Sequence, residues 1–175
     1  MLQKGYIQLY TGNGKGKTTA ALGLALRAAG AGMKSIVIQF MKGQHYNELE
    51  SVKKLDGLIV IEQYGSEDFC NVDDKNLSQH YNLAKNGYNR AVEVISNNRF
   101  PIVILDEIIT AYLFKLVTLD DILNLIKLKH DDTELILTGR GAPMELIERC
   151  DLVTEMKEIK HYYHDGVTAR VGIEH

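Results

Sequence analysis

Tyr-Thr-Gly-Asn-Gly-Lys-Gly-Lys-Thr-Thr, residues 10–19, follows the apolar run that begins at Tyr6 and opens a helical pattern at Lys17. The glycines at positions 12, 14 and 16 let the backbone turn its N–H groups toward an anion. The first turn of the helix adds the positive end of its dipole to the same place. The stretch therefore predicts a phosphate-binding loop between a strand and a helix.

The type of phosphate follows from the residues that close this loop. Lys17 is placed to reach the outer phosphates of a nucleoside triphosphate, and the Thr18 hydroxyl is placed to ligate the Mg²⁺ that bridges them. The usual template has a glycine where this chain has Thr11, so the loop is a shortened variant. Lys15 either adds positive charge beside the phosphates or points to solvent. The loop residues expected to bind ATP are Gly12, Asn13, Gly14, Lys15, Gly16, Lys17, Thr18 and Thr19.

Composition limits the alternatives. A chain of 175 residues with 45% hydrophobic content can bury one core, so we expect a single domain over residues 1–175. The net charge of −3, with both signs interspersed, gives no basic face for a nucleic acid. The sequence has neither a membrane-spanning apolar run nor a signal-peptide pattern, and Cys70 and Cys150 lack metal-type spacing. We therefore expect a cytoplasmic protein with free thiols and no membrane partner.

Short apolar runs alternate with helical patterns along the chain, which is typical of strands joined by crossover helices. The predicted fold is α/β, with a mostly parallel sheet of about six strands and helices on both faces. The strands are expected at Ile7–Tyr10, Ser35–Phe40, Leu58–Glu62, Ile102–Leu105, Glu134–Thr138 and Leu152–Glu155. Helices are expected at Lys17–Gly30 and Leu77–Asn97, and from a cap at Thr118 to Leu128, with Asp121 in place of the Glu or Gln of a full capping box.

Two carboxylates follow a predicted buried strand, at Asp106 and Glu107. Ligands bind at the carboxyl edge of open parallel sheets. We therefore expect Asp106 to hold Mg²⁺, directly or through water, and Glu107 to position a water, a ribose hydroxyl or a neighbouring side chain. The alternative is that both residues only cap the following turn.

Arginines supply two further candidates. Arg140 follows another strand, in Thr-Gly-Arg-Gly-Ala-Pro at residues 138–143, and can neutralise a phosphate as a planar fork. Surface exposure without a function is the competing interpretation of Arg140. Arg27 lies far along the first helix, where arginine is more often solvated.

Several ordered blocks give the chain a closer resemblance. It resembles the P-loop ATP:corrinoid adenosyltransferases from Tyr6 to Glu174. The blocks that carry the resemblance are residues 11–21, 27–30, 39–43, 105–107, 138–143, 145–147, 151–156, 160–161 and 172–174. Their order and separations are more specific than any one of them.

The resemblance implies transfer of the 5′-deoxyadenosyl group of ATP to the cobalt(I) of a reduced corrinoid, with release of triphosphate. It implies a recombinase-like P-loop NTPase core, a homodimer, and a flavoprotein-type electron donor. Lys17 and Lys15 would stabilise the leaving triphosphate, and Arg27, Glu107 and Arg140 would also contact ATP. Thr18 and Asp106 would serve Mg²⁺, and no residue would act as a general acid or base. A P-loop small-molecule kinase or ATPase is the alternative.

The chain departs from the family pattern where many relatives carry an aromatic segment that faces the corrinoid. Here the corresponding stretch offers Tyr64, Phe69 and Cys70, and the chain has no tryptophan. Relatives also carry an N-terminal extension before the first strand, whereas this sequence begins almost on it. The histidines at positions 45, 80, 161 and 164 lack metal-type spacing, so we expect local contacts for them and no cobalt ligation.

Overall fold

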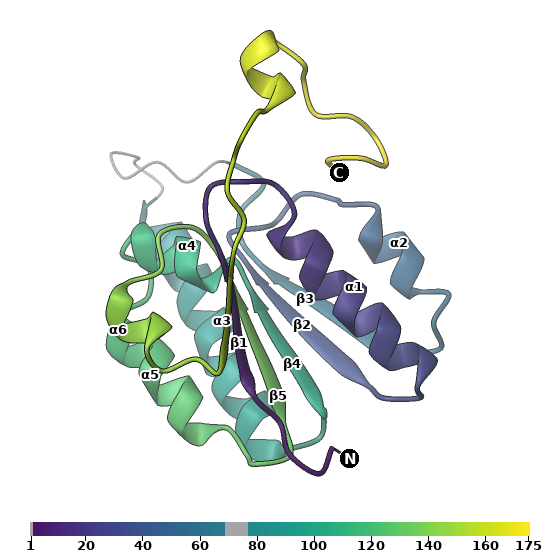
Figure 1. Cartoon of the computed structure of the whole chain (residues 1–175), viewed down its shortest axis with the longest axis vertical. Helices are drawn as coiled ribbons and strands as arrows, with labels where there is room; N and C mark the ends of the chain where they lie inside the picture. Colours follow the sequence, from purple (N-terminus) through teal and green to yellow (C-terminus); the bar gives the residue numbers. More distant parts are fainter. Residues whose placement is uncertain (1, 69–76) are drawn as a thin grey trace.

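The computed structural model describes residues 2–68 and 77–175, and its centre is a six-stranded sheet in which every pairing is parallel (Figure 1). The strand order is β3-β2-β4-β5-β1-β6. The strands are β1 Ile7–Thr11, β2 Ser35–Phe40, β3 Ile59–Tyr64, β4 Ile102–Asp106, β5 Glu134–Thr138 and β6 Leu152–Glu155. The predicted α/β class and parallel sheet are confirmed, with strand ends that shift by one or two residues.

Helices cover both faces of the sheet, as predicted (Figure 1). On one side lie α1 (Lys17–Gly30) and α2 (Glu48–Val52). On the other lie α3 (Leu77–Asn97), α4 (Ile108–Leu113), α5 (Leu119–Leu128) and α6 (Met144–Ile147). The sequence did not predict α2, α4 and α6, because helices of four to six residues are too short to show a helical period.

The hydrophobic core divides into two layers because the side chains of each strand alternate between faces. In β4, Ile102 and Ile104 pack with the alanines of α1, whereas Val103 and Leu105 pack with the side chains of α3 and α5. All five residues of β4 are buried. This burial on both faces explains why the sequence shows an unbroken apolar run there.

A complete capping box begins α5. The Thr118 hydroxyl accepts a bond from the Asp121 amide at 3.1 Å, and the Asp121 carboxylate accepts the Thr118 amide at 2.8 Å. The shorter aspartate thus closes the box that the sequence had left incomplete.

The phosphate loop packs against the chain that leaves β6. The Gly14 amide donates to the Met156 carbonyl at 2.6 Å, and the Met156 amide donates to the Thr11 carbonyl at 2.8 Å. A Cβ at Gly12 would lie 2.5 Å from the Met156 carbonyl oxygen, and Gly12 also has a φ of +95°. Glycine at position 12 is therefore required by the fold itself and not only by a ligand.

We expect Gly12→Ala to destabilise the protein by about 1–3 kcal/mol, because the added methyl group meets a backbone oxygen in a left-handed conformation. Gly23→Ala is the control. Gly23 is exposed in the middle of α1 with open space around it, so this change should stabilise by about 0.5–1 kcal/mol. Urea denaturation of both variants measures the difference, and equal effects would contradict the argument.

Candidate active site

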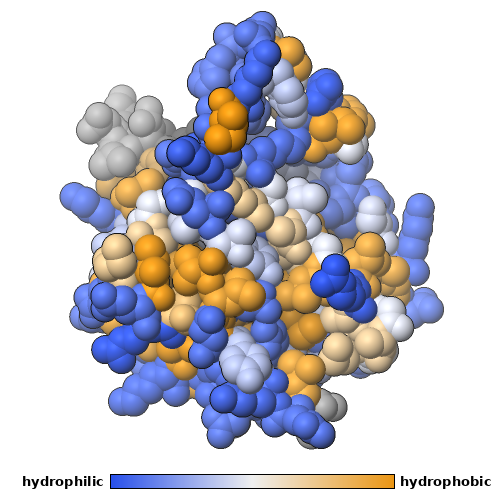
Figure 2. Space-filling view, in the orientation of Figure 1, coloured by the Kyte–Doolittle hydropathy of each residue, from blue (hydrophilic) through white to orange (hydrophobic). Residues whose placement is uncertain are grey.

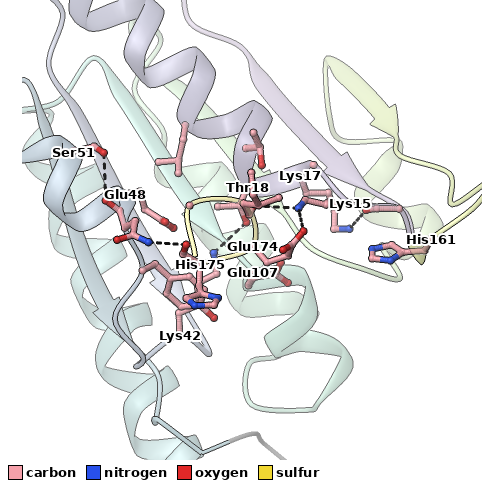
Figure 3. A pocket seen from close by; sticks show the side chains of 18 of the residues that line it. Lys15, Lys17, Thr18, Lys42, Glu48, Ser51, Glu107, His161, Glu174 and His175 are labelled. Carbon is pink, nitrogen blue, oxygen red and sulfur yellow. Dashed lines mark hydrogen bonds and ion pairs between the residues drawn. The ribbon is translucent and has the colours of Figure 1, made fainter. Parts of the chain in front are cut away.

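A cavity of about 650 Å³ lies at the carboxyl edge of the sheet, where the phosphate loop meets α1 (Figure 3). Its walls come from the phosphate loop and α1, from the β2–α2 connection and α2, from the ends of β4 and β5, and from the C-terminal segment. The lining residues are Gly14, Lys15, Gly16, Lys17, Thr18, Thr19, Leu22, Lys42, Tyr46, Asn47, Glu48, Ser51, Glu107, Arg140, His161, Gly172, Ile173, Glu174 and His175. The edge of the sheet predicted to bind the ligand therefore carries the larger of the two described cavities.

Asp106 ends β4 directly below this cavity and is fully buried. Its carboxylate accepts bonds from the Thr18 hydroxyl at 2.9 Å and from the Thr138 hydroxyl at 2.7 Å. Gln39 Nε2 and Lys42 Nζ donate to the other carboxylate oxygen at 3.2 and 2.9 Å. A buried charge with this many donors is held in one orientation.

Lys42 completes this network from the loop after β2. Its ammonium lies 2.9 Å from Asp106 Oδ2 and 3.2 Å from Thr18 Oγ1, and its side chain is only 14% exposed. Burial is the largest single effect and would lower the pKa of Lys42, but the neighbouring Asp106 carboxylate, together with Glu107 and Glu48, outweighs burial and the pKa is raised. Lys42 is thus a cation at neutral pH.

Lys17, the first residue of α1, turns back onto its own loop. Its ammonium donates to the carbonyls of Gly12 at 2.7 Å and Gly14 at 2.8 Å (Figure 3). Burial lowers the pKa of Lys17, and the Glu107 carboxylate opposes that shift. Among the described residues this ammonium bonds to backbone oxygens alone, so a phosphate oxygen would be a stronger acceptor for it.

Glu107 stands where the strand turns into α4. Its φ of 60° is unusual for a residue other than glycine, and its amide donates to the Thr138 hydroxyl at 2.9 Å. The Thr110 hydroxyl donates to its carboxylate and also accepts the Arg140 amide at 3.1 Å. This connection between the ends of β4 and β5 holds Glu107 and Arg140 at the cavity wall.

The C-terminal segment closes one side of the cavity and rises above the sheet edge in Figure 1. Glu174 is its centre, because the carboxylate accepts bonds from Arg170, Tyr162 and Lys15, with Lys15 Nζ at 2.8 Å. The Arg170 guanidinium, with Lys15 and Tyr162, holds the pKa of Glu174 well below its usual range. Lys15 therefore joins the phosphate loop to the segment, and Asn47 Nδ2 adds a bond to the His175 carbonyl at 2.8 Å.

The structure does not bring every predicted residue to the cavity. Arg27 lies in the last turn of α1, about 15 Å along the helix from Lys17, and Asn13 is exposed outside the lining. Tyr64 packs against Gly87 of α3, and its hydroxyl donates to Glu62 at 3.0 Å. Phe69 and Cys70, the other two residues expected to face the corrinoid, lie outside the described residues.

Of the four histidines considered above as metal ligands, three make the expected local contacts. His164 lies 2.8 Å from Glu158, His45 lies 3.6 Å from Glu50, and His161 Nδ1 accepts the Tyr163 amide. His80, the fourth, lies in the first turn of α3 and is buried. Within residues 2–68 and 77–175, no group of three His, Cys, Asp or Glu side chains could hold a metal ion.

Sequence reasoning gave no role to several cavity residues: Lys42, Tyr46, Asn47, Glu48, Ser51, His161 and residues 172–175. A signal existed for some of them. Lys42, His161 and Glu174 belong to blocks that carry the family resemblance, and Lys42 comes two residues after β2 while Glu174 comes two residues after Gly172. Their meeting at one cavity depends on strand order, which those blocks do not encode.

Comparison with known proteins identifies the family of the chain. Residues 3–175 match the family model described as ATP:corrinoid adenosyltransferase BtuR/CobO/CobP. A corrinoid adenosyltransferase from Sinorhizobium sp. is 35% identical over 98% of this chain and 81% of the relative. A corrinoid adenosyltransferase from Escherichia coli K12 is 31% identical over 99% of this chain and 87% of the relative.

The chain belongs to this family. Corrinoid adenosyltransferase CobA from Salmonella typhimurium LT2, 29% identical over 99% of this chain and 87% of the relative, extends the same likeness. In the part of the chain that the structure describes, no helix is long and apolar enough to cross a membrane.

We expect Glu174→Gln to loosen the C-terminal segment, because the neutral amide weakens its bonds to Lys15 and Arg170. Limited proteolysis followed by mass spectrometry should show cleavage between residues 157 and 175 several-fold faster than in the parent protein. Glu93→Gln, which changes a surface ion pair with Arg90, is the matched control and should leave cleavage unchanged. Equal cleavage in all three proteins would show that Glu174 does not order the segment.

Proposed function

We propose that this protein transfers the 5′-deoxyadenosyl group of ATP to the cobalt(I) of a reduced corrinoid and releases triphosphate. The observation that carries the proposal is the phosphate loop at the sheet edge, with the Lys17 ammonium buried among loop carbonyls beside the cavity. Membership of the adenosyltransferase family supports this reaction over phosphoryl transfer to a small molecule or water.

The reaction requires the protein to bind the substrates and to stabilise the charge on the departing triphosphate, and it requires no proton transfer. The electron pair of cobalt(I), a substrate, forms the bond to ribose C5′, while the C5′–O bond breaks and its pair goes to the triphosphate. No proton is transferred in that step, so no general base is required. What the protein must supply is positive charge where the triphosphate departs.

The loop residues are our candidates for that task. We propose that the amides of residues 12, 13 and 15–18 and the ammonium groups of Lys17 and Lys15 bind the triphosphate, with Arg140 and Glu107 at the cavity wall. The Gly14 amide donates to the Met156 carbonyl, so Gly14 would contribute through the turn that it allows. Lys15 would leave Glu174 for a phosphate oxygen or bind both. Arg27 has weaker support because the structure places it away from the cavity.

Thr18 and Asp106 are proposed to hold Mg²⁺. Their oxygens are the hard donors that Mg²⁺ prefers, and Lys42 Nζ, a cation, stands within 3.2 Å of both in this structure. Two protein oxygens are enough for Mg²⁺, because this ion keeps several of its waters and takes its other ligands from phosphates. Bound Mg²⁺ would neutralise charge on the triphosphate as it leaves.

Further features that the family resemblance implies are proposed as well. β6 is an edge strand whose four residues are all exposed, and Figure 2 shows apolar surface on the face where α6 and β1 lie, which supports a homodimer. Cys150 is a free, half-buried thiol, which suits the cytoplasm. We also propose one domain over residues 1–175, a flavoprotein-type electron donor, and corrinoid contacts from Tyr64, Phe69 and Cys70.

The proposed reaction is tested by incubating the protein with ATP, Mg²⁺ and chemically reduced cobalamin. We expect triphosphate and a light-sensitive alkylcobalt product, whereas ADP would indicate a kinase or ATPase. Lys17→Ala should lower kcat/KM by about 10²–10³-fold, because one charged donor to the leaving group is lost. Lys53→Ala, which changes an exposed lysine paired with Glu50, should have no effect. Full activity of Lys17→Ala would contradict the proposal.

A further inference from the structure

Lys42 occupies the place between the two residues proposed to hold Mg²⁺. Its ammonium is 2.9 Å from Asp106 Oδ2 and 3.2 Å from Thr18 Oγ1, and it also lies 5.1 Å from the centre of the Tyr46 ring. The side chain lines the cavity, so its other side faces the space open to a ligand (Figure 3). One lysine thus contacts the buried carboxylate and the cavity at the same time.

The charges around Lys42 set a condition on metal binding. Asp106 is fully buried and is the carboxylate that Lys42 contacts directly, so the pair is close to neutral. A divalent cation bound to Asp106 and Thr18 would lie against the Lys42 ammonium. Glu107 and Glu48 also act on Lys42 from further away, but Asp106 is the carboxylate that pairs with it directly, and that one charge cannot neutralise both cations. The repulsion is offset most strongly when anionic oxygens enter the site together with the metal and contact both cations.

A polyphosphate brings such oxygens. The lysine side chain is a flexible stem with a compact charge, so its ammonium can leave Asp106 and donate to a phosphate oxygen a few ångströms away. In that arrangement the metal takes over the contacts with Thr18 and Asp106, and Lys42 joins Lys17 as a cation on the phosphates.

We propose that Lys42 is a placeholder cation: it holds the Thr18–Asp106 site against free divalent metal ions and leaves it when the metal arrives with a polyphosphate. The proposal rests on the proposed function for its ligand. It makes metal and nucleotide binding interdependent, since each removes the obstacle to the other. Lys42 is therefore a positioning residue that selects the metal–nucleotide complex over the free metal.

The test compares the parent protein with Lys42→Met by calorimetry and thermal unfolding, using Mg²⁺ alone and then Mg²⁺ with ATP. For Mg²⁺ alone we expect no heat and no shift in Tm in the parent protein at low millimolar concentration. In Lys42→Met the uncovered Asp106 carboxylate should bind free Mg²⁺ more tightly by about 5–150-fold, and Mg²⁺ should raise Tm. Affinity for Mg²⁺ with ATP should fall by about 10–100-fold, because a charged donor to phosphate is gone.

Two further variants separate charge from structure. Lys42→Arg keeps the positive charge and should still exclude free Mg²⁺. If Lys42→Met fails to fold, Lys42→Gln, which also removes the charge but keeps a donor for Asp106, takes its place in both titrations. Lys53→Met removes an exposed lysine away from the site and should match the parent protein in both titrations. A merely structural role for Lys42 would lower Tm without any gain in Mg²⁺ binding.

The proposal is overturned if the parent protein binds free Mg²⁺ as tightly as Lys42→Met does, or if Lys42→Arg gains free Mg²⁺ binding equal to that of Lys42→Met. Failure of the proposed function has a different signature: the parent protein would then bind no Mg²⁺·ATP, or would form no alkylcobalt product. Opposite changes in affinity for the free metal and for the metal–nucleotide complex support the proposal.

Discussion

The fully buried carboxylate of Asp106 is the constraint on which the rest of the structure depends. An ionised group away from water must be surrounded by donors, and these donors come from distant parts of the chain. Thr18 donates from α1, Thr138 donates from the end of β5, and Gln39 and Lys42 donate from β2 and the loop that follows it. Satisfying one charge therefore fixes the strands and the helix that carry the site, and removing one donor would disturb both fold and function.

The site is rich in cations, yet each of its lysines already has partners. Lys17 bonds to the carbonyls of its own loop, Lys15 bonds to Glu174, and Lys42 bonds to Asp106. Binding of a polyphosphate would then exchange acceptors for these ammonium groups, because phosphate oxygens replace protein oxygens. This arrangement reconciles a polyanion site with a chain whose net charge is −3. The affinity of such a site for a polyphosphate comes from the difference between the lysines' hydrogen bonds to phosphate oxygens and their hydrogen bonds to protein oxygens.

Local patterns were sufficient to predict the parts of the fold that depend on neighbours in sequence. The phosphate loop, the long helices and the six strands are encoded by glycine spacing and by apolar periods, so their positions were predicted within one or two residues. The short helices carry no period. The meeting of Lys42 with Asp106 could not be predicted, because it depends on β2 lying beside β4 with Gln39 opposite Asp106. Likewise, nothing in the sequence around Lys15 indicates that its partner is Glu174, 159 residues further along the chain.

The position of β1 in the sheet has a consequence for how the chain folds. β1 pairs with β5 and β6, and its pairing with β5 starts at Ile7 opposite Leu135, which are 128 residues apart. A ribosome adding about 5–20 residues per second needs on the order of ten seconds to make the intervening chain. During that time β1 has no strand to pair with, so this early segment reaches its native place late in synthesis. Such long-range pairing is expected to make folding slow and to leave an apolar strand for chaperones to protect.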